Sequence, residues 1–218
     1  MSDDVKGKQP PTAAANVVDT RGEIGTLILI LLAWLGTYFP WVAAGVTAFS
    51  VNLYDLAEWS SLNPAIRGGT IPLLATFCLR AAVGLIAIRL ALQAATNSHR
   101  VVRQAIRLLA LLIGIGLLPP FDFIRGAFDD PNYRQQFLIA VVSCLAIIAT
   151  WRVSHPGNNL SPLAVATTLL NWFAFAMGAI GLVVGIQALG RLGLRASYGP
   201  GAVLTLVASW VLFLTKLI

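Results

Sequence analysis

The sequence predicts an all-helical integral membrane protein, a polytopic transmembrane helix bundle of about six spans. Of its 218 residues, 57% are hydrophobic and only 11% are charged, whereas a soluble domain usually carries about 25% charged residues. The mean hydropathy is +0.79, and long apolar stretches alternate with short polar ones. A water-soluble fold of this length needs more polar surface than 15 basic and 9 acidic side chains supply.

The spans follow from the lengths of the apolar runs. A bilayer core about 30 Å thick requires roughly 20 mostly apolar residues per helix. Six runs meet or approach this length, and because three of them are short, five or seven spans stay open. The predicted spans are residues 24–39, 70–94, 101–118, 135–151, 163–189 and 202–217.

The first residues differ in composition from the rest. Residues 1–22 combine Pro, Ala and both charge signs without periodicity, which predicts a disordered cytoplasmic tail. Asp3 and Asp4 beside two lysines make the tail a poor signal peptide. Residues 23–218 are predicted to form a single transmembrane helical domain.

The segment after the first span can be interpreted in more than one way. Its first part, VAAGVTAF, is apolar and could lengthen the first helix through Pro40. In its second part, helical spacing puts Leu53, Leu56 and Ser60 on one face, with Asp55 and Glu58 on another. This pattern suits a possible interfacial helix at residues 51–61. The same residues could instead form a cap folded over the helix ends.

The distribution of basic residues predicts the orientation. With the N-terminus inside, inner segments hold eight Lys and Arg residues and outer segments hold five; Arg89 would add a ninth inner one if its side chain snorkels. This bias predicts that both termini are cytoplasmic, in what we expect to be a bacterial cytoplasmic membrane. The inner set is Lys6, Lys8, Arg21, Arg100, Arg103, Arg107, Arg152 and Lys216, and the outer set is Arg67, Arg125, Arg134, Arg191 and Arg195.

Arg80 is the charge that topology does not explain. It lies near the centre of the second span, where a charge costs about 2.5–3.5 kcal/mol on insertion scales. Helical spacing puts it on one stripe with small residues, so it should face other helices. That stripe contains Gly84, Ala87, Ala91 and Ala94.

Three carboxylates are candidate partners for Arg80. Asp122 is the nearest by depth, and Asp55 or Glu58 could fold in from the first outer loop. A pair of this kind would lock the second helix to its neighbours. The alternatives are an anion or headgroup site in an outward-facing cavity, or an arginine that snorkels to the outer interface.

A second pattern lies in the fifth span. Small residues recur at spacings of four, three, four and three, which predicts close helix packing, within the chain or against another copy or subunit. The stripe is Ala174, Gly178, Gly181, Gly185 and Ala188.

The sequence points to no catalytic chemistry. Cys78 and Cys144 lie in apolar runs, and His99 and His155 fall in predicted loops. No motif of a protease, hydrolase, nucleotide-binding or dinucleotide-binding protein is present. We therefore expect no enzymatic activity, no catalytic residue, no cofactor and no bound metal.

These features predict a non-catalytic structural, accessory or assembly subunit of a membrane complex. The predicted partners are the lipid bilayer and other membrane subunits or further copies of the chain, and no nucleic acid. The alternative is a small transporter or channel with a polar path around Arg80.

Overall fold

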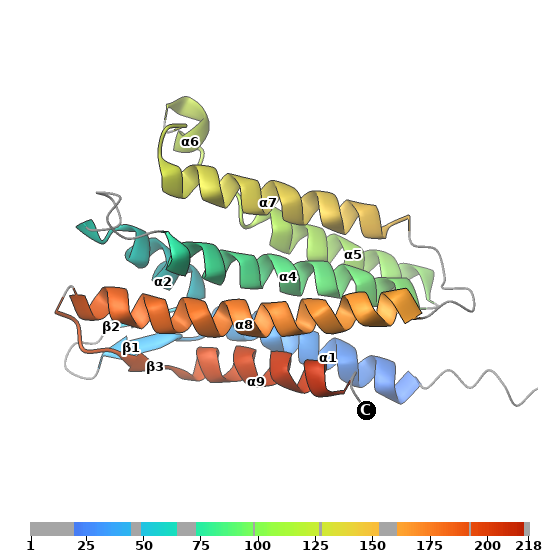
Figure 1. The fold of residues 1–218 in the computed structure, drawn as a ribbon. Coiled ribbons are helices and arrows are strands. Elements are labelled where there is room, and N and C mark those ends of the chain that lie inside the picture. The colour runs from blue at the N-terminus through green and yellow to red at the C-terminus, as the bar shows by residue number, and fades with distance from the viewer. Residues whose placement is uncertain are drawn as a thin grey trace, which may run out of the picture.

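A computed structural model describes residues 20–44, 49–64, 73–97, 99–126, 128–152, 161–191 and 193–215 (Figure 1). These residues are mostly helical, as predicted, and the predicted tail at residues 1–22 lies almost wholly outside them. The six long helices are α1 (Thr20–Gly36), α4 (Leu74–Thr96), α5 (Arg100–Ile115), α7 (Pro131–Thr150), α8 (Ser161–Arg191) and α9 (Pro200–Leu214). The shorter elements are α2 (Leu53–Ser61), α6 (Asp122–Arg125) and the strands β1 (Val42–Ala44), β2 (Phe49–Val51) and β3 (Ser197–Tyr198).

Three of the described helices are long and apolar enough to cross a membrane: Leu74–Thr96, Pro131–Thr150 and Leu163–Arg191. The apolar helices Gly22–Gly36 and Pro200–Leu214 are shorter. The fourth predicted span begins earlier than expected, at Pro131, because the Asp130 side chain caps the helix there and Pro131 occupies its first turn.

A small sheet was not predicted. Strand β1 pairs antiparallel with both β2 and β3, in the order β2-β1-β3. The alternative in which residues after Pro40 lengthen the first helix does not hold, since α1 ends at Gly36. The Trp41 indole Nε1 donates to the Gly36 carbonyl at 3.0 Å, and the Trp41 amide donates to Val51 at 2.8 Å. Proline restricts the residue before it to extended backbone, so the chain turns into the strand.

Helix α2 occupies most of the segment predicted as an interfacial helix. Its N-cap Asn52 accepts a hydrogen bond from the Asp55 amide. Leu53, Leu56 and Ser60 form one buried face of the helix, and Asp55 is exposed. The buried face packs against α4 and α8, which fits the alternative interpretation of a cap over the helix ends.

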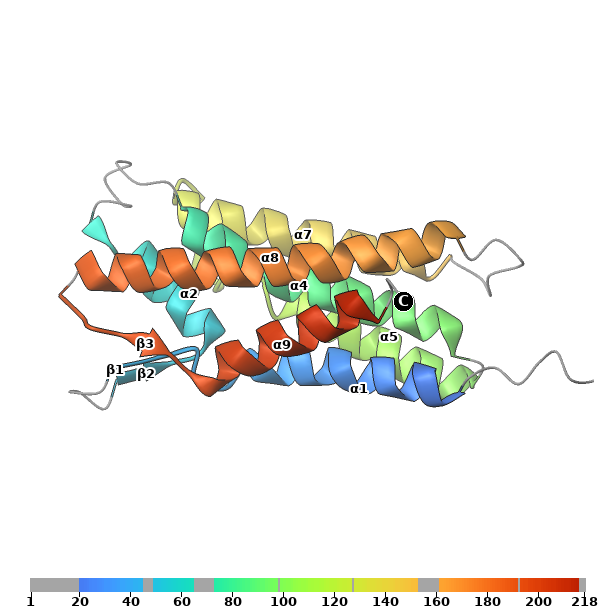
Figure 2. The ribbon, with the colours of Figure 1, turned by 60° about the horizontal axis from the view of Figure 1, so that its bottom comes forward.

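Helix α4 is central. It contacts α1, α2, α5, α7 and α8, and 17 of its 23 residues are buried. In both ribbon views it lies between α7 and α1 (Figure 2). A polar side chain on one of the buried faces of α4 therefore meets protein.

Helices α1 and α9 pack closely along the side opposite α7. The Thr205 hydroxyl donates to the Ala33 carbonyl at 3.0 Å, and Gly201 lies against the backbone at the end of α1. Residues from the start of α1 and the residue after α9, Thr215, line one pocket. The first and last described helical segments thus begin and end at the same end of the molecule.

Candidate functional site

The buried charge Arg80 is held from two neighbouring helices at the Leu74 end of α4. Its Nη2 donates to Glu58 Oε2 of α2 at 3.0 Å. Its Nη1 donates to Asn132 Oδ1 of α7 at 2.7 Å and reaches the Asn132 carbonyl at 3.4 Å. The Arg80 side chain is 5% exposed and the Glu58 side chain 45%. Arg80 therefore connects α4, α2 and α7.

Helix caps place both partners of Arg80. Asn52 fixes the start of α2, and Glu58 follows on the side that meets α4. Asp130 Oδ1 accepts from the Asn132 amide at 2.8 Å and from the Tyr133 amide at 3.4 Å. This cap holds Asn132 in the first turn of α7, with its side chain directed to Arg80.

A second polar contact joins α4 and α7 beside Arg80. The Thr76 hydroxyl lies 2.9 Å from Gln135 Oε1, and Gln135 Nε2 donates to the Leu73 carbonyl at 3.3 Å. A pocket of about 290 Å³ opens next to these contacts. It is lined by Glu58, Ser61, Leu73, Asp130, Pro131, Asn132 and Tyr133.

The structure brings Arg80 together with one of the three carboxylates considered from the sequence. Glu58 is the partner, and Asp55 lies exposed on the other side of α2. Asp122 is the candidate partner nearest to Arg80 by depth in the membrane, but its side chain lies outside the described part of the structure. Asn132 was missed because the fourth span was predicted to begin at Gln135. The Asp-Pro pair before it is a helix-start signal that could have placed it.

The small-residue stripe of α8 lies against other helices of the same chain. A Cβ atom at Gly181 would come within 2.7 Å of the Leu79 side chain of α4, and one at Gly185 within 3.2 Å of Leu56 of α2. A Cβ atom at Gly178 would meet Leu206 of α9 at 3.1 Å. Ala174 and Ala188 are buried. The stripe thus holds α8 close to α4, α2 and α9.

A second arginine of α4, Arg89, is also buried, with 3% exposure. It does not reach the surface, as a snorkelling side chain would. Its Nη1 donates to Gln93 Oε1 at 3.0 Å, while its Nε has no hydrogen-bond partner. Within the described residues, no carboxylate lies within 4.0 Å of its guanidinium.

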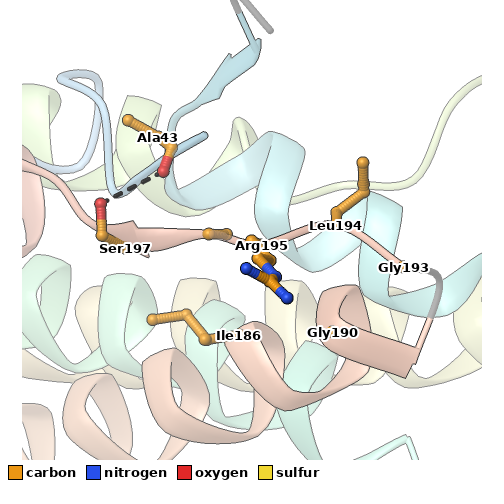
Figure 3. A pocket seen from close by; sticks show the side chains of 8 residues that line it. Ala43, Ile186, Gly190, Gly193, Leu194, Arg195 and Ser197 are labelled. Carbon is orange, nitrogen blue, oxygen red and sulfur yellow. Dashed lines mark hydrogen bonds between the residues drawn. The ribbon is translucent and has the colours of Figure 1, made fainter. Parts of the chain in front are cut away.

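A third feature is a pocket at the end of α8, shown in Figure 3. Its volume is about 570 Å³. The exposed Arg195 lies in it between Ile186 and the strand residues, and the Ser197 hydroxyl donates to the Ala43 carbonyl at 3.3 Å. The pocket wall consists of Ala43, Ile186, Gly190, Gly193, Leu194, Arg195, Ala196 and Ser197. This lining supplies one cation and apolar surface, without an acid or a nucleophile–base pair.

The described side chains assemble no recognisable catalytic group. Among them, no three His, Cys, Asp or Glu residues are close enough to hold a metal ion. Cys78 and Cys144 are free thiols on α4 and α7. On α2, burial raises the pKa of Tyr54 above its ordinary value, which keeps this phenol neutral.

No family model matches the chain, and no curated protein or solved structure is significantly similar to it. The described geometry itself defines the class: a mostly helical protein with three helices, in its described part, that are long and apolar enough to span a membrane.

Proposed function

We propose that this chain is a six-span membrane protein without catalytic activity that serves as a structural, accessory or assembly subunit of a membrane complex. The observation that carries the proposal is that the buried Arg80 guanidinium donates to both Glu58 and Asn132. Both partners belong to the chain, and each comes from a different helix. A buried arginine used in this way fixes helix positions, and Glu58 already supplies the counter-charge that an anionic solute would otherwise bring.

Six spans require the three shorter helices α1, α5 and α9 to cross the bilayer as well. Helices α1, α5 and α9 have 17, 16 and 15 residues, or about 25, 24 and 22 Å at 1.5 Å per residue. These lengths fall short of a 30 Å core, and short spans are accommodated by local thinning of the bilayer. The β1–β3 sheet follows α1 and precedes α9, so it extends both at one end. An even number of crossings also agrees with Gly22 and Thr215 lining the same pocket.

The exposed apolar faces of the helices support the proposal that the chain contacts lipid or other proteins. On α7, Leu138, Val142 and Leu145 are each more than 60% exposed and lie on one helical face. Apolar surface of this extent is unfavourable in water. We propose that it contacts lipid and, in part, other membrane subunits or further copies of the chain, in a bacterial cytoplasmic membrane with both termini cytoplasmic.

A small transporter or channel is the second candidate, and the observation in its favour is the second buried arginine. Arg80 and Arg89 are nine residues apart, which corresponds to about 13.5 Å along α4 and about 180° around it. The two guanidinium groups therefore lie on opposite faces of the central helix. A single polar path along one face would not meet both of them, which favours the structural role.

The experiment is purification of the tagged full chain from its native membrane in a mild detergent, followed by native mass spectrometry. We expect a defined complex with another membrane protein or a homo-oligomer. A lone monomer, with no cross-linked partner in intact membranes, would overturn the subunit proposal. Solute flux in proteoliposomes that is lost in a folded Arg80→Met variant would favour the transporter.

The span number has its own test. Single cysteines are introduced into a variant lacking Cys78 and Cys144, at exposed positions Asp129, Ser197, His99 and Arg152. Six spans with cytoplasmic termini predict labelling by a membrane-impermeant reagent from outside at positions 129 and 197 only. Labelling of 99 or 152 from outside contradicts this topology.

A further inference from the structure

A pocket of about 590 Å³ with several polar lining residues lies at the Thr96 end of α4, away from the Arg80 contacts. Its volume falls within the range of small-molecule sites. One wall comes from α1, the floor from α4 and a third side from the end of α9. The lining residues are Gly22, Glu23, Gly25, Thr26, Leu29, Gln93, Thr96 and Thr215.

The floor of this cavity presents hydrogen-bond donors. Arg89 can only donate hydrogen bonds, so its contact with Gln93 Oε1 fixes the direction of that amide. The Gln93 NH₂ group then points away from Arg89 and donates one hydrogen to Thr96 Oγ1 at 3.1 Å. Its second N–H has no partner in the described structure. The nearby cation polarises this donor, which favours an anionic acceptor.

The walls present acceptors. The Thr26 hydroxyl donates to the Gly22 carbonyl at 2.8 Å, and the Thr215 hydroxyl donates to the Leu212 carbonyl at 3.1 Å. Their oxygen lone pairs remain for other donors. The Glu23 carboxylate forms no ion pair among the described residues. An ammonium group, with three donors and a positive charge, complements this wall.

We propose that the cavity binds a zwitterion with a primary ammonium and a phosphate, the chemistry of a phosphoethanolamine group. The phosphate accepts from Gln93, with Arg89 as the buried charge behind it, and the ammonium binds Glu23 and the threonine oxygens. The anion supplies the negative charge that Arg89 lacks within the described structure. Burying an unpaired charge is costly, so a counter-anion near Arg89 stabilises the folded protein. This inference does not depend on the proposed subunit function.

The test measures binding to the purified, delipidated full chain through the shift in its thermal unfolding midpoint. The probes are phosphatidylethanolamine, phosphatidylcholine and phosphatidylglycerol with identical acyl chains, together with soluble O-phosphoethanolamine. We expect binding of phosphatidylethanolamine about tenfold tighter than of the other two lipids, because a trimethylammonium donates no N–H and glycerol carries no charge. A response to the soluble compound as well identifies a free ligand, and a response to the lipid alone identifies a headgroup.

Two variants report on the site without removing a buried charge. Glu23→Gln keeps the shape of the side chain and should abolish the preference for ethanolamine over glycerol. Gln93→Leu should weaken binding of every phosphate probe. Thr167→Val is the matched control, since Thr167 is a buried helical threonine that donates to the Ala164 carbonyl and does not line the cavity. Equal binding of all three lipids, or an unchanged preference in Glu23→Gln, would overturn the proposal.

Discussion

The two buried arginines of α4 have nearly equal exposure, 4% for Arg80 and 3% for Arg89, yet their surroundings differ. Arg80 meets a carboxylate and an amide from two other helices. Arg89 meets the side chain of Gln93, four residues along its own helix. The first arginine therefore restrains tertiary structure, whereas the described contacts of the second are local to α4.

The two halves of α4 therefore differ in what surrounds their polar side chains. At the Leu74 end, polar contacts and close glycine packing join α4 to α2, α7 and α8. At the Thr96 end, a pocket lies beside Gln93 and Thr96. Removing a charge whose partners lie in the same chain is destabilising because the partners are left unpaired, whereas an uncompensated buried charge is costly until a counter-charge binds.

The largest effect is expected from Arg80→Met. This substitution removes the ion pair and leaves Asn132 Oδ1 buried without its donor, so we expect a loss of about 2–4 kcal/mol. The measurement is the free energy of reversible unfolding in mixed detergent micelles. Arg195→Met, at an exposed position, is the control and should stay within about 0.5 kcal/mol of the parent chain. An Arg80→Met protein as stable as the parent would show that the cluster does not hold the helices.

Gly181→Ala tests the packing beside Arg80. The added Cβ would lie 2.7 Å from the Leu79 side chain and 3.0 Å from its backbone nitrogen, so α8 must move away from α4. Overpacking of this kind costs about 1–3 kcal/mol. Gly190→Ala on the same helix meets nothing within 4 Å and should be neutral or stabilising by up to about 1 kcal/mol. Similar losses in both variants would contradict the close contact.

Glu58→Gln removes the charge of the partner while keeping an acceptor for Arg80. Because the Glu58 side chain is 45% exposed, solvent weakens the pair, and we expect a loss of about 1–2 kcal/mol. Asp55→Asn, three residues earlier and exposed, is the matched control. A double-mutant cycle with Arg80→Met should show coupling between 58 and 80. Equal effects of the two substitutions on α2 would exclude a specific pair.

The long helices could be predicted because their apolar runs are far longer than any strand. The sheet could not, since β1 and β2 have three residues each and β3 has two, too few for a period of two to appear. Register also depends on Ser197 and Tyr198, more than 150 residues along the chain from Val42 and Ala43. Such pairing is set by tertiary structure.

The sequence predicts how deep Arg80 lies in its span, but not which side chains bind it. Arg80 is recognisable because a charge interrupts an apolar span. Which carboxylate meets it depends on how α2 folds back onto α4, and Asp55 and Glu58 differ by only three positions. Arg89 lies near the end of the same span, so from the sequence its side chain could snorkel to the surface. It is buried because other helices pack around α4.

Arg89→Met is expected to change the free energy of unfolding least. It should raise this free energy slightly, whereas Arg80→Met lowers it. Arg89→Met breaks no ion pair in the described structure, and the thioether chain fills a similar volume; the acceptor that it frees, Gln93 Oε1, belongs to a side chain that lines a pocket and can turn toward it. Replacing an uncompensated buried charge with an apolar side chain is neutral or stabilising, so we expect the delipidated protein to change by no more than about 1 kcal/mol, toward higher stability. The measurement is the same unfolding free energy, compared directly with Arg80→Met. If Arg89→Met destabilises the delipidated chain as much as Arg80→Met does, Arg89 has a structural partner, and the contrast between the two ends of α4 is wrong.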